Sequence, residues 1–103
     1  MHRPSVLAAT RAPVPADAPI TWLGGPPDDE DARIVWETLT RDRIARHGAL
    51  VERVAERLFR RDLRSIGAAA DIGFFRPFYV AHARALVAAL DGTTLRIGRP
   101  VAS

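Results

Sequence analysis

Residues 46–64 read RHGALVERVAERLFRRDLR, and two periodic patterns overlap in this one stretch. At about 100° per residue, an α-helix brings five of its arginines into one narrow sector. We call these five residues the arginine ridge: Arg46, Arg53, Arg57, Arg60 and Arg64. The adjoining sector holds the apolar residues Leu50, Val51, Val54, Ala55 and Leu58. The stretch therefore predicts an amphipathic helix with a core face beside a cationic surface.

The arginine ridge has two interpretations. Guanidinium groups spaced at i, i+3, i+4 and i+7 can hold carboxylates or phosphates as a set, which suits an acidic protein partner or a nucleic acid. Alternatively, the ridge is only a solvated helix face. Glu52 and Glu56 lie along one edge, and Glu56 precedes Arg60 by four residues. We expect these two carboxylates to neutralise part of the ridge.

The composition indicates one small domain that depends on arginine for its positive charge. The 103 residues include 15 arginines, no lysine and 12 acidic residues, for a net charge of +3. The absence of cysteine excludes disulfides and thiolate metal sites. A folded core of this size often gains stability by oligomerising or by docking on a partner.

The N-terminal quarter of the chain differs from the rest in its proline content. Residues 1–27 hold six of the eight prolines, which predicts an extended arm rather than a helix. Within the arm, residues 20–23 (ITWL) are typical of a strand. We expect Trp22 either to dock on the folded body or to anchor a partner. The predicted organisation is an arm at 1–27, a helical domain at 28–97 and a C-terminal tail at 98–103.

Three helices are expected in the domain, at 29–47, 49–65 and 76–90. Asp28 can cap the first helix, and the acidic residues after it suit the positive end of the helix dipole. Gly48 is interpreted as the residue that ends this helix. The alternative is one unbroken helix through Gly48, at a cost of about 1 kcal/mol relative to alanine.

The helix at 76–90 is apolar on nearly every side, which indicates a central position in the fold or in an oligomer. Pro77 suits its first turn, and Phe74 and Phe75 precede it in a loop. Its expected buried face is Phe78, Tyr79, His82, Ala85, Leu86 and Ala89. Residues 20–23 and 93–97 are both β-prone and can form a minor two-stranded contact. The predicted fold class is therefore all-α, with three helices and this small β contact.

The segment 66–79 loosely resembles the helix-turn-helix units of bacterial regulators. The resemblance is carried by Ala69, Ile72, Gly73, Phe74 and Tyr79. It implies a second helix that reads DNA, although Arg76, His82 and Arg84 are the main polar side chains which that helix would offer to bases.

The remaining motifs exclude more than they indicate. Three scattered histidines give no metal-ligand spacing, no catalytic motif is present, and no cofactor is predicted. No apolar run is long enough for a membrane span, so a cytoplasmic location is expected.

We expect a non-enzymatic protein-binding module that associates with itself or with a larger assembly; nucleic-acid binding is the alternative. The expected partner-binding residues are the arginine ridge with Trp22, Phe74 and Phe75.

Overall fold

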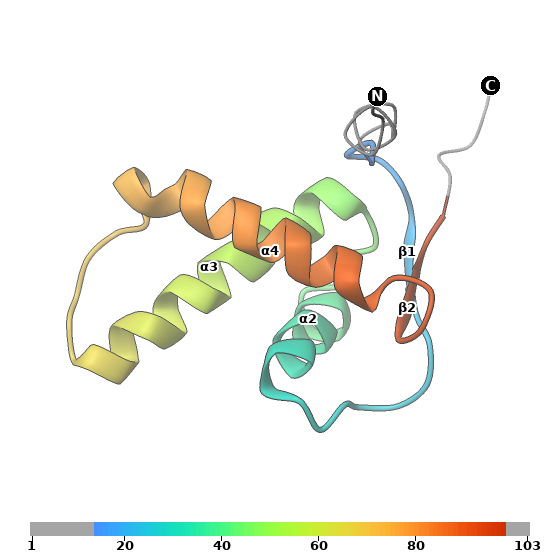
Figure 1. The fold of residues 1–103 in the computed structure, drawn as a ribbon, viewed down its shortest axis with the longest axis horizontal. Helices are drawn as coiled ribbons and strands as arrows, with labels where there is room; N and C mark the ends of the chain where they lie inside the picture. Colours follow the sequence, from blue (N-terminus) through green and yellow to red (C-terminus); the bar gives the residue numbers. More distant parts are fainter. Residues whose placement is uncertain (1–13, 99–103) are drawn as a thin grey trace, which may run out of the picture.

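The computed structural model describes residues 14–98, and residues 1–13 and 99–103 lie outside the described residues. Three helices and a two-stranded antiparallel sheet make up this part of the chain (Figure 1). In chain order the elements are β1 (Ile20–Trp22), α2 (Glu30–Arg41), α3 (His47–Ile66), the short 3₁₀ helix η1 (Gly73–Phe75), α4 (Arg76–Leu90) and β2 (Leu95–Ile97). The mainly helical fold with a minor β contact is confirmed.

Helix α3 carries the core, as its apolar pattern predicted. All five apolar residues named for this helix are almost completely buried. They pack against Val35 of α2, against Ala83 and Val87 of α4, and against Ile20 and Leu95 of the two strands. Burying each valine, leucine or isoleucine side chain of this cluster contributes about 1.5–3 kcal/mol to folding.

The two strands pair as the sequence suggested. Ile20 lies opposite Ile97, and Trp22 lies opposite Leu95. Trp22 packs against the core, and its indole N–H donates a hydrogen bond to the carbonyl oxygen of Gly25 at 2.9 Å. Trp22 therefore docks on the folded body.

Helix α2 starts one residue later than predicted, with Asp29 rather than Asp28 as its cap, and it also ends earlier. Asp29 is the N-cap, and its side chain accepts a hydrogen bond from the backbone N–H of Ala32. The prediction that this helix continues to residue 47 is wrong, because α2 ends at Arg41. Arg43 adopts a left-handed backbone conformation, with φ of 54°. Ala45 accepts a hydrogen bond from the N–H of Ile20, so the connector holds the arm instead of extending the helix.

Two separate helices form, as predicted, and the alternative of one unbroken helix is wrong; Gly48, however, does not end the first of them. It belongs to the first turn of α3. Its N–H donates a hydrogen bond to the carbonyl oxygen of Ala16 at 2.8 Å. A Cβ at this position would lie 2.7 Å from the Cβ of Ala16. Glycine is therefore required because the arm crosses the start of α3 at contact distance.

Helix α3 ends at Ile66, close to the predicted boundary, with Gly67 in the left-handed conformation. Residues 67–72 then form a loop. The helix-turn-helix interpretation is wrong, because Ala69 lies in this loop and not in a helix. The bounds of α4 are those predicted, and Pro77 lies in its first turn.

The buried face of α4 was predicted wrongly, because a different side of the helix faces the core. The residues that the structure buries are Ala83 and Val87, flanked by the partly buried Tyr79, Val80, Leu86 and Leu90. Phe78, His82, Ala85 and Ala89 are exposed instead. A helix that is apolar on nearly all sides has no strong periodic signal, so its contacts with α3 decide which side turns inward.

Candidate functional site

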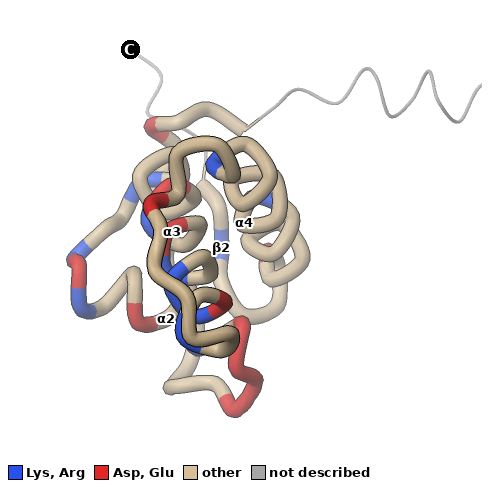
Figure 2. Tube along the Cα trace, turned by 90° about the vertical axis from the view of Figure 1, so that its left-hand side faces the viewer, with Lys and Arg blue, Asp and Glu red and all other residues tan. Residues whose placement is uncertain are grey.

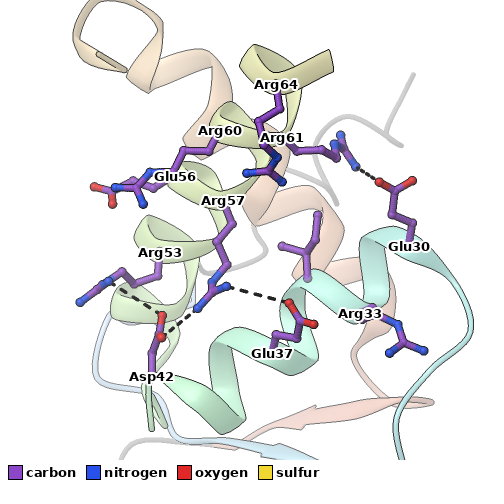
Figure 3. A pocket seen from close by; sticks show the side chains of 11 residues that line it. Glu30, Arg33, Glu37, Asp42, Arg53, Glu56, Arg57, Arg60, Arg61 and Arg64 are labelled. Atoms are coloured by element: carbon purple, nitrogen blue, oxygen red, sulfur yellow. Dashed lines mark hydrogen bonds and ion pairs between the residues drawn. The ribbon is translucent and has the colours of Figure 1, made fainter. Parts of the chain in front are cut away.

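The helices α2 and α3 enclose a groove of about 380 Å³ that is lined almost entirely by charged side chains (Figure 3). We call it the arginine groove. Its arginines are Arg33, Arg53, Arg57, Arg60, Arg61 and Arg64, and its carboxylates are Glu30, Glu37, Asp42 and Glu56. Ile34 is the single apolar lining residue. Figure 2 shows that charged positions follow α3, whereas α4 carries few.

The structure brings four of the five ridge residues together in this groove. Arg46 does not reach it. That residue is the N-cap of α3, and its guanidinium donates a hydrogen bond to the carbonyl oxygen of Asp17 at 3.3 Å. The sequence pattern missed Arg33 and Arg61, which join the groove because α2 lies alongside α3.

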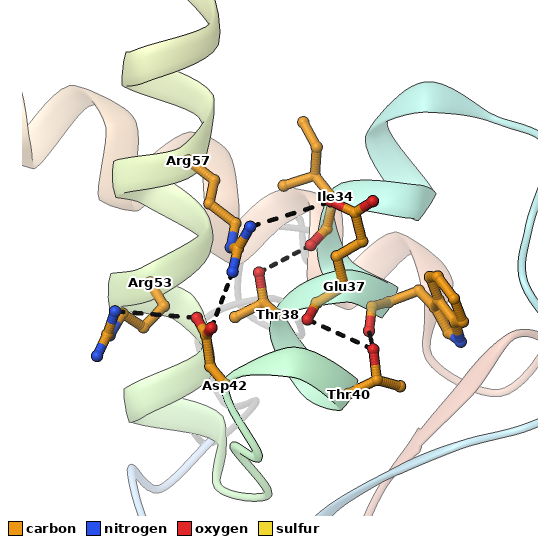
Figure 4. A network of polar contacts seen from close by, with 8 residues as sticks. Ile34, Glu37, Thr38, Thr40, Asp42, Arg53 and Arg57 are labelled. Atoms are coloured by element: carbon orange, nitrogen blue, oxygen red, sulfur yellow. Dashed lines mark hydrogen bonds and ion pairs between the residues drawn. The ribbon is translucent and has the colours of Figure 1, made fainter.

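Asp42 ties the end of α2 to the middle of α3 (Figure 4). Its Oδ1 accepts a hydrogen bond from Nη2 of Arg57 at 2.8 Å. Arg57 also places Nη1 4.0 Å from the carboxylate of Glu37. The second oxygen of Asp42 lies 3.9 Å from Arg53 and accepts no hydrogen bond in the described part of the chain, although it is buried. Arg57 is thus a structural link, and Arg53 is held only loosely.

Arg61 makes the corresponding link at the other end of α2. It donates a hydrogen bond to Asp31 at 2.6 Å and lies 3.7 Å from Glu30 and 3.4 Å from Asp62. The hydrogen bond to Asp31 raises the pKa of the Arg61 guanidinium above its ordinary value, against the opposing effect of burial. Arg61 therefore links α3 to the first turn of α2 through Glu30 and Asp31.

Arg60 and Arg64 are not neutralised in this way. Both are exposed, and neither makes an ion pair with any residue between 14 and 98. The expected pairing of Glu56 with Arg60 is wrong. Glu56 lies 3.5 Å from Arg76 of α4, which also binds Glu52 at 2.9 Å. Because Arg76 of α4 pairs with Glu52 and Glu56, these two carboxylates do not neutralise Arg60 and Arg64.

A second surface lies at the start of α4, where aromatic rings cluster. Phe59 of α3 contacts both Phe75 and Tyr79, with centroid distances of 6.1 and 5.3 Å. The Tyr79 hydroxyl donates a 2.5 Å hydrogen bond to Asp62, which raises the pKa of Tyr79. Phe74 and Phe78 add their rings to this cluster from outside and are 89% and 71% exposed.

Phe74 and Phe78 continue into an uncharged strip that we call the outer face of α4. On α4 its members at helical spacing are Phe78, Ala81, His82, Ala85 and Ala89, and Phe74 of η1 precedes them; all six are exposed. The sequence predicted Phe74 and Phe75 as contact residues. It placed Phe78 in the interior, because nothing in the local pattern separates a buried apolar face from an unpartnered one.

The described residues contain no group of three or more potential metal ligands and no helix long and apolar enough to cross a membrane. Comparison with protein-family models, curated proteins and solved structures gave no match to this chain.

Proposed function

We propose that this chain is a protein-binding module that associates with a second copy of itself through the outer face of α4. The observation that carries the proposal is the exposure of Phe74 and Phe78 on a face whose described residues include no aspartate, glutamate, lysine or arginine. Burying one phenylalanine side chain contributes about 1.5–3 kcal/mol, and a two-fold interface buries each of these residues twice. Exposed apolar surface of this kind is typical of an interaction site.

The distribution of side-chain size along the outer face favours a second copy as the partner. The large residues, Phe74 and Phe78, lie at the start of the face, and the small residues Ala85 and Ala89 lie at its end. In an antiparallel pair of α4 helices, a two-fold axis near Ala81 and His82 sets the large end of one copy against the small end of the other. The face is therefore complementary to itself in shape.

Sedimentation analysis over a wide range of protein concentration tests this function. We expect the unmodified chain to form dimers, and the double variant F74S/F78S to be monomeric at the same concentration while retaining its helical circular dichroism. The matched control is Ile66→Ser, because Ile66 is 74% exposed but lies at the end of α3, outside the outer face. A monomeric unmodified chain, or equal weakening by the control, contradicts the proposal.

A further inference from the structure

The arginine groove contains more arginines than carboxylates, and not all of its arginines form ion pairs with the described residues. Its six arginines and four carboxylates leave a formal charge of +2. Arg57 and Arg61 are bound to carboxylates that hold α2 against α3. Arg60 and Arg64 make no ion pair within the described part of the chain. An arginine that supports no internal contact is available for a ligand.

The spacing of the groove arginines suits a ligand with several separate anionic groups. Arg60 and Arg64 lie one helical turn apart on α3, and Arg53 lies at the other end of the same row. From residue 53 to 64 the row extends about 16 Å along the helix axis. Successive carboxylates on one side of a peptide lie roughly 5–7 Å apart, whether it is helical or extended. A short acidic peptide can therefore engage several guanidinium groups at once.

The lining of the groove favours a peptide over a nucleic acid. Among the residues that the structure describes, no aromatic side chain lines it, so these residues offer bases no surface on which to stack. Ile34 provides an apolar contact between the charges, which suits an aliphatic side chain of a peptide.

We infer that the arginine groove binds an acidic peptide segment of a partner protein, with Arg60 and Arg64 holding its carboxylates by bidentate hydrogen bonds. This site shares no residue with the outer face of α4. One copy of the chain can therefore bind a second copy and the acidic segment together.

Fluorescence anisotropy with the full chain tests the inference. The probe is a fluorescein-labelled peptide of ten residues in which glutamate and alanine alternate, and oligothymidylate of similar charge is the competitor. We expect R60Q/R64Q to raise the peptide Kd about tenfold or more, as for arginines at the centre of an interface. The matched control is R84Q/R96Q, which removes the same charge from two exposed positions outside the groove.

A Kd that rises equally in both double variants would mean that only net charge matters, and it would overturn the inference. Absence of peptide binding by the unmodified chain would overturn it too. So would tighter binding of oligothymidylate than of the peptide, which would favour a nucleic-acid ligand. Retained peptide binding by F74S/F78S is expected, so failure of the self-association proposal and failure of this inference are distinguishable.

Discussion

Two buried features at the start of α3 depend on single residues. Gly48 allows the arm to cross the helix, and its N–H binds the carbonyl oxygen of Ala16. The neighbouring His47 is buried, and its backbone N–H binds Ala18. Both residues lie where residues 16–18 pass over the start of α3. Each can be tested by replacing a single side chain.

Replacing Gly48 with alanine is expected to destabilise the chain, although alanine is the better helix former. The added Cβ would lie 2.7 Å from Ala16, so the arm must shift and its hydrogen bond to Gly48 weakens. Overpacking of this kind typically costs about 1–3 kcal/mol, which exceeds the roughly 1 kcal/mol gained in helix propensity. Urea denaturation measures the free energy of unfolding. The control is Gly25→Ala, because a Cβ at Gly25 meets nothing within 4 Å; equal stability of the G48A and unmodified chains would refute the role of this contact.

His47 makes the stability depend on pH. Burial, assisted by the charge of Arg84, lowers the pKa of His47 below its usual 6.5. Between pH 6.5 and the lowered value, the unfolded state binds more protons than the folded state, so stability is lost as the pH falls through this window. Glu52 and Arg84 are the charged residues that line the pocket beside His47.

Thermal unfolding measured from pH 7.5 down to pH 5.5 checks this prediction, since most carboxylates titrate lower. We expect the Tm to fall over this range in the unmodified chain and in the control His82→Gln, whose exposed imidazole lies outside the interior. His47→Gln should show a flatter dependence. An unchanged slope in H47Q would assign the effect to other groups.

At the scale of the helices, ion pairs between α2 and α3 shape the arginine groove. The hydrogen-bonded pair of Asp42 and Arg57 has side chains that are only 19% and 32% exposed, whereas Arg53 is 59% exposed and lies 3.9 Å from the same carboxylate. A partly screened pair with direct hydrogen bonding contributes up to about 1 kcal/mol, and a long exposed pair contributes close to nothing.

Double-mutant cycles built from D42N with R57A and from D42N with R53A separate these two contacts. We expect a coupling free energy of about 0.5–1 kcal/mol for Asp42 with Arg57, and a value near zero for Asp42 with Arg53. Urea denaturation of the unmodified chain, the two single variants and the double variant supplies the four values of each cycle. Equal coupling in the two cycles would mean that Arg53 is held as firmly as Arg57, and that the groove has less charge available than we infer.

The sequence predicted those elements whose causes are local. The apolar pattern of α3, the bounds of α4 and the strand character of residues 20–22 and 95–97 follow from nearby residues and are confirmed. The end of α2 was wrong because residues 45–48 bind the arm, a contact that no local pattern shows. The same limit applies to the groove, since the link between Glu56 and Arg76 joins different helices.

For the whole molecule, the two proposed surfaces use separate parts of one small fold. The arginine groove lies between α2 and α3, and the outer face of α4 is the side of that helix which the core leaves uncovered. The core cluster links all three helices, so it fixes both surfaces in one rigid arrangement. The central claim is that the uncovered face of α4 is an interface between two copies of the chain.

Disulfide trapping tests this claim most directly, because the natural chain contains no cysteine. A single Ala81→Cys variant places a thiol next to the proposed two-fold axis, where the two Cα atoms can approach to the roughly 4.4–6.8 Å that a disulfide needs. Under mild oxidation at low protein concentration, we predict rapid formation of a covalent dimer by A81C. Little dimer is expected from Ser65→Cys, at an exposed site on α3, or from A81C combined with F74S/F78S. Trapping of A81C no faster than S65C would contradict the proposed interface.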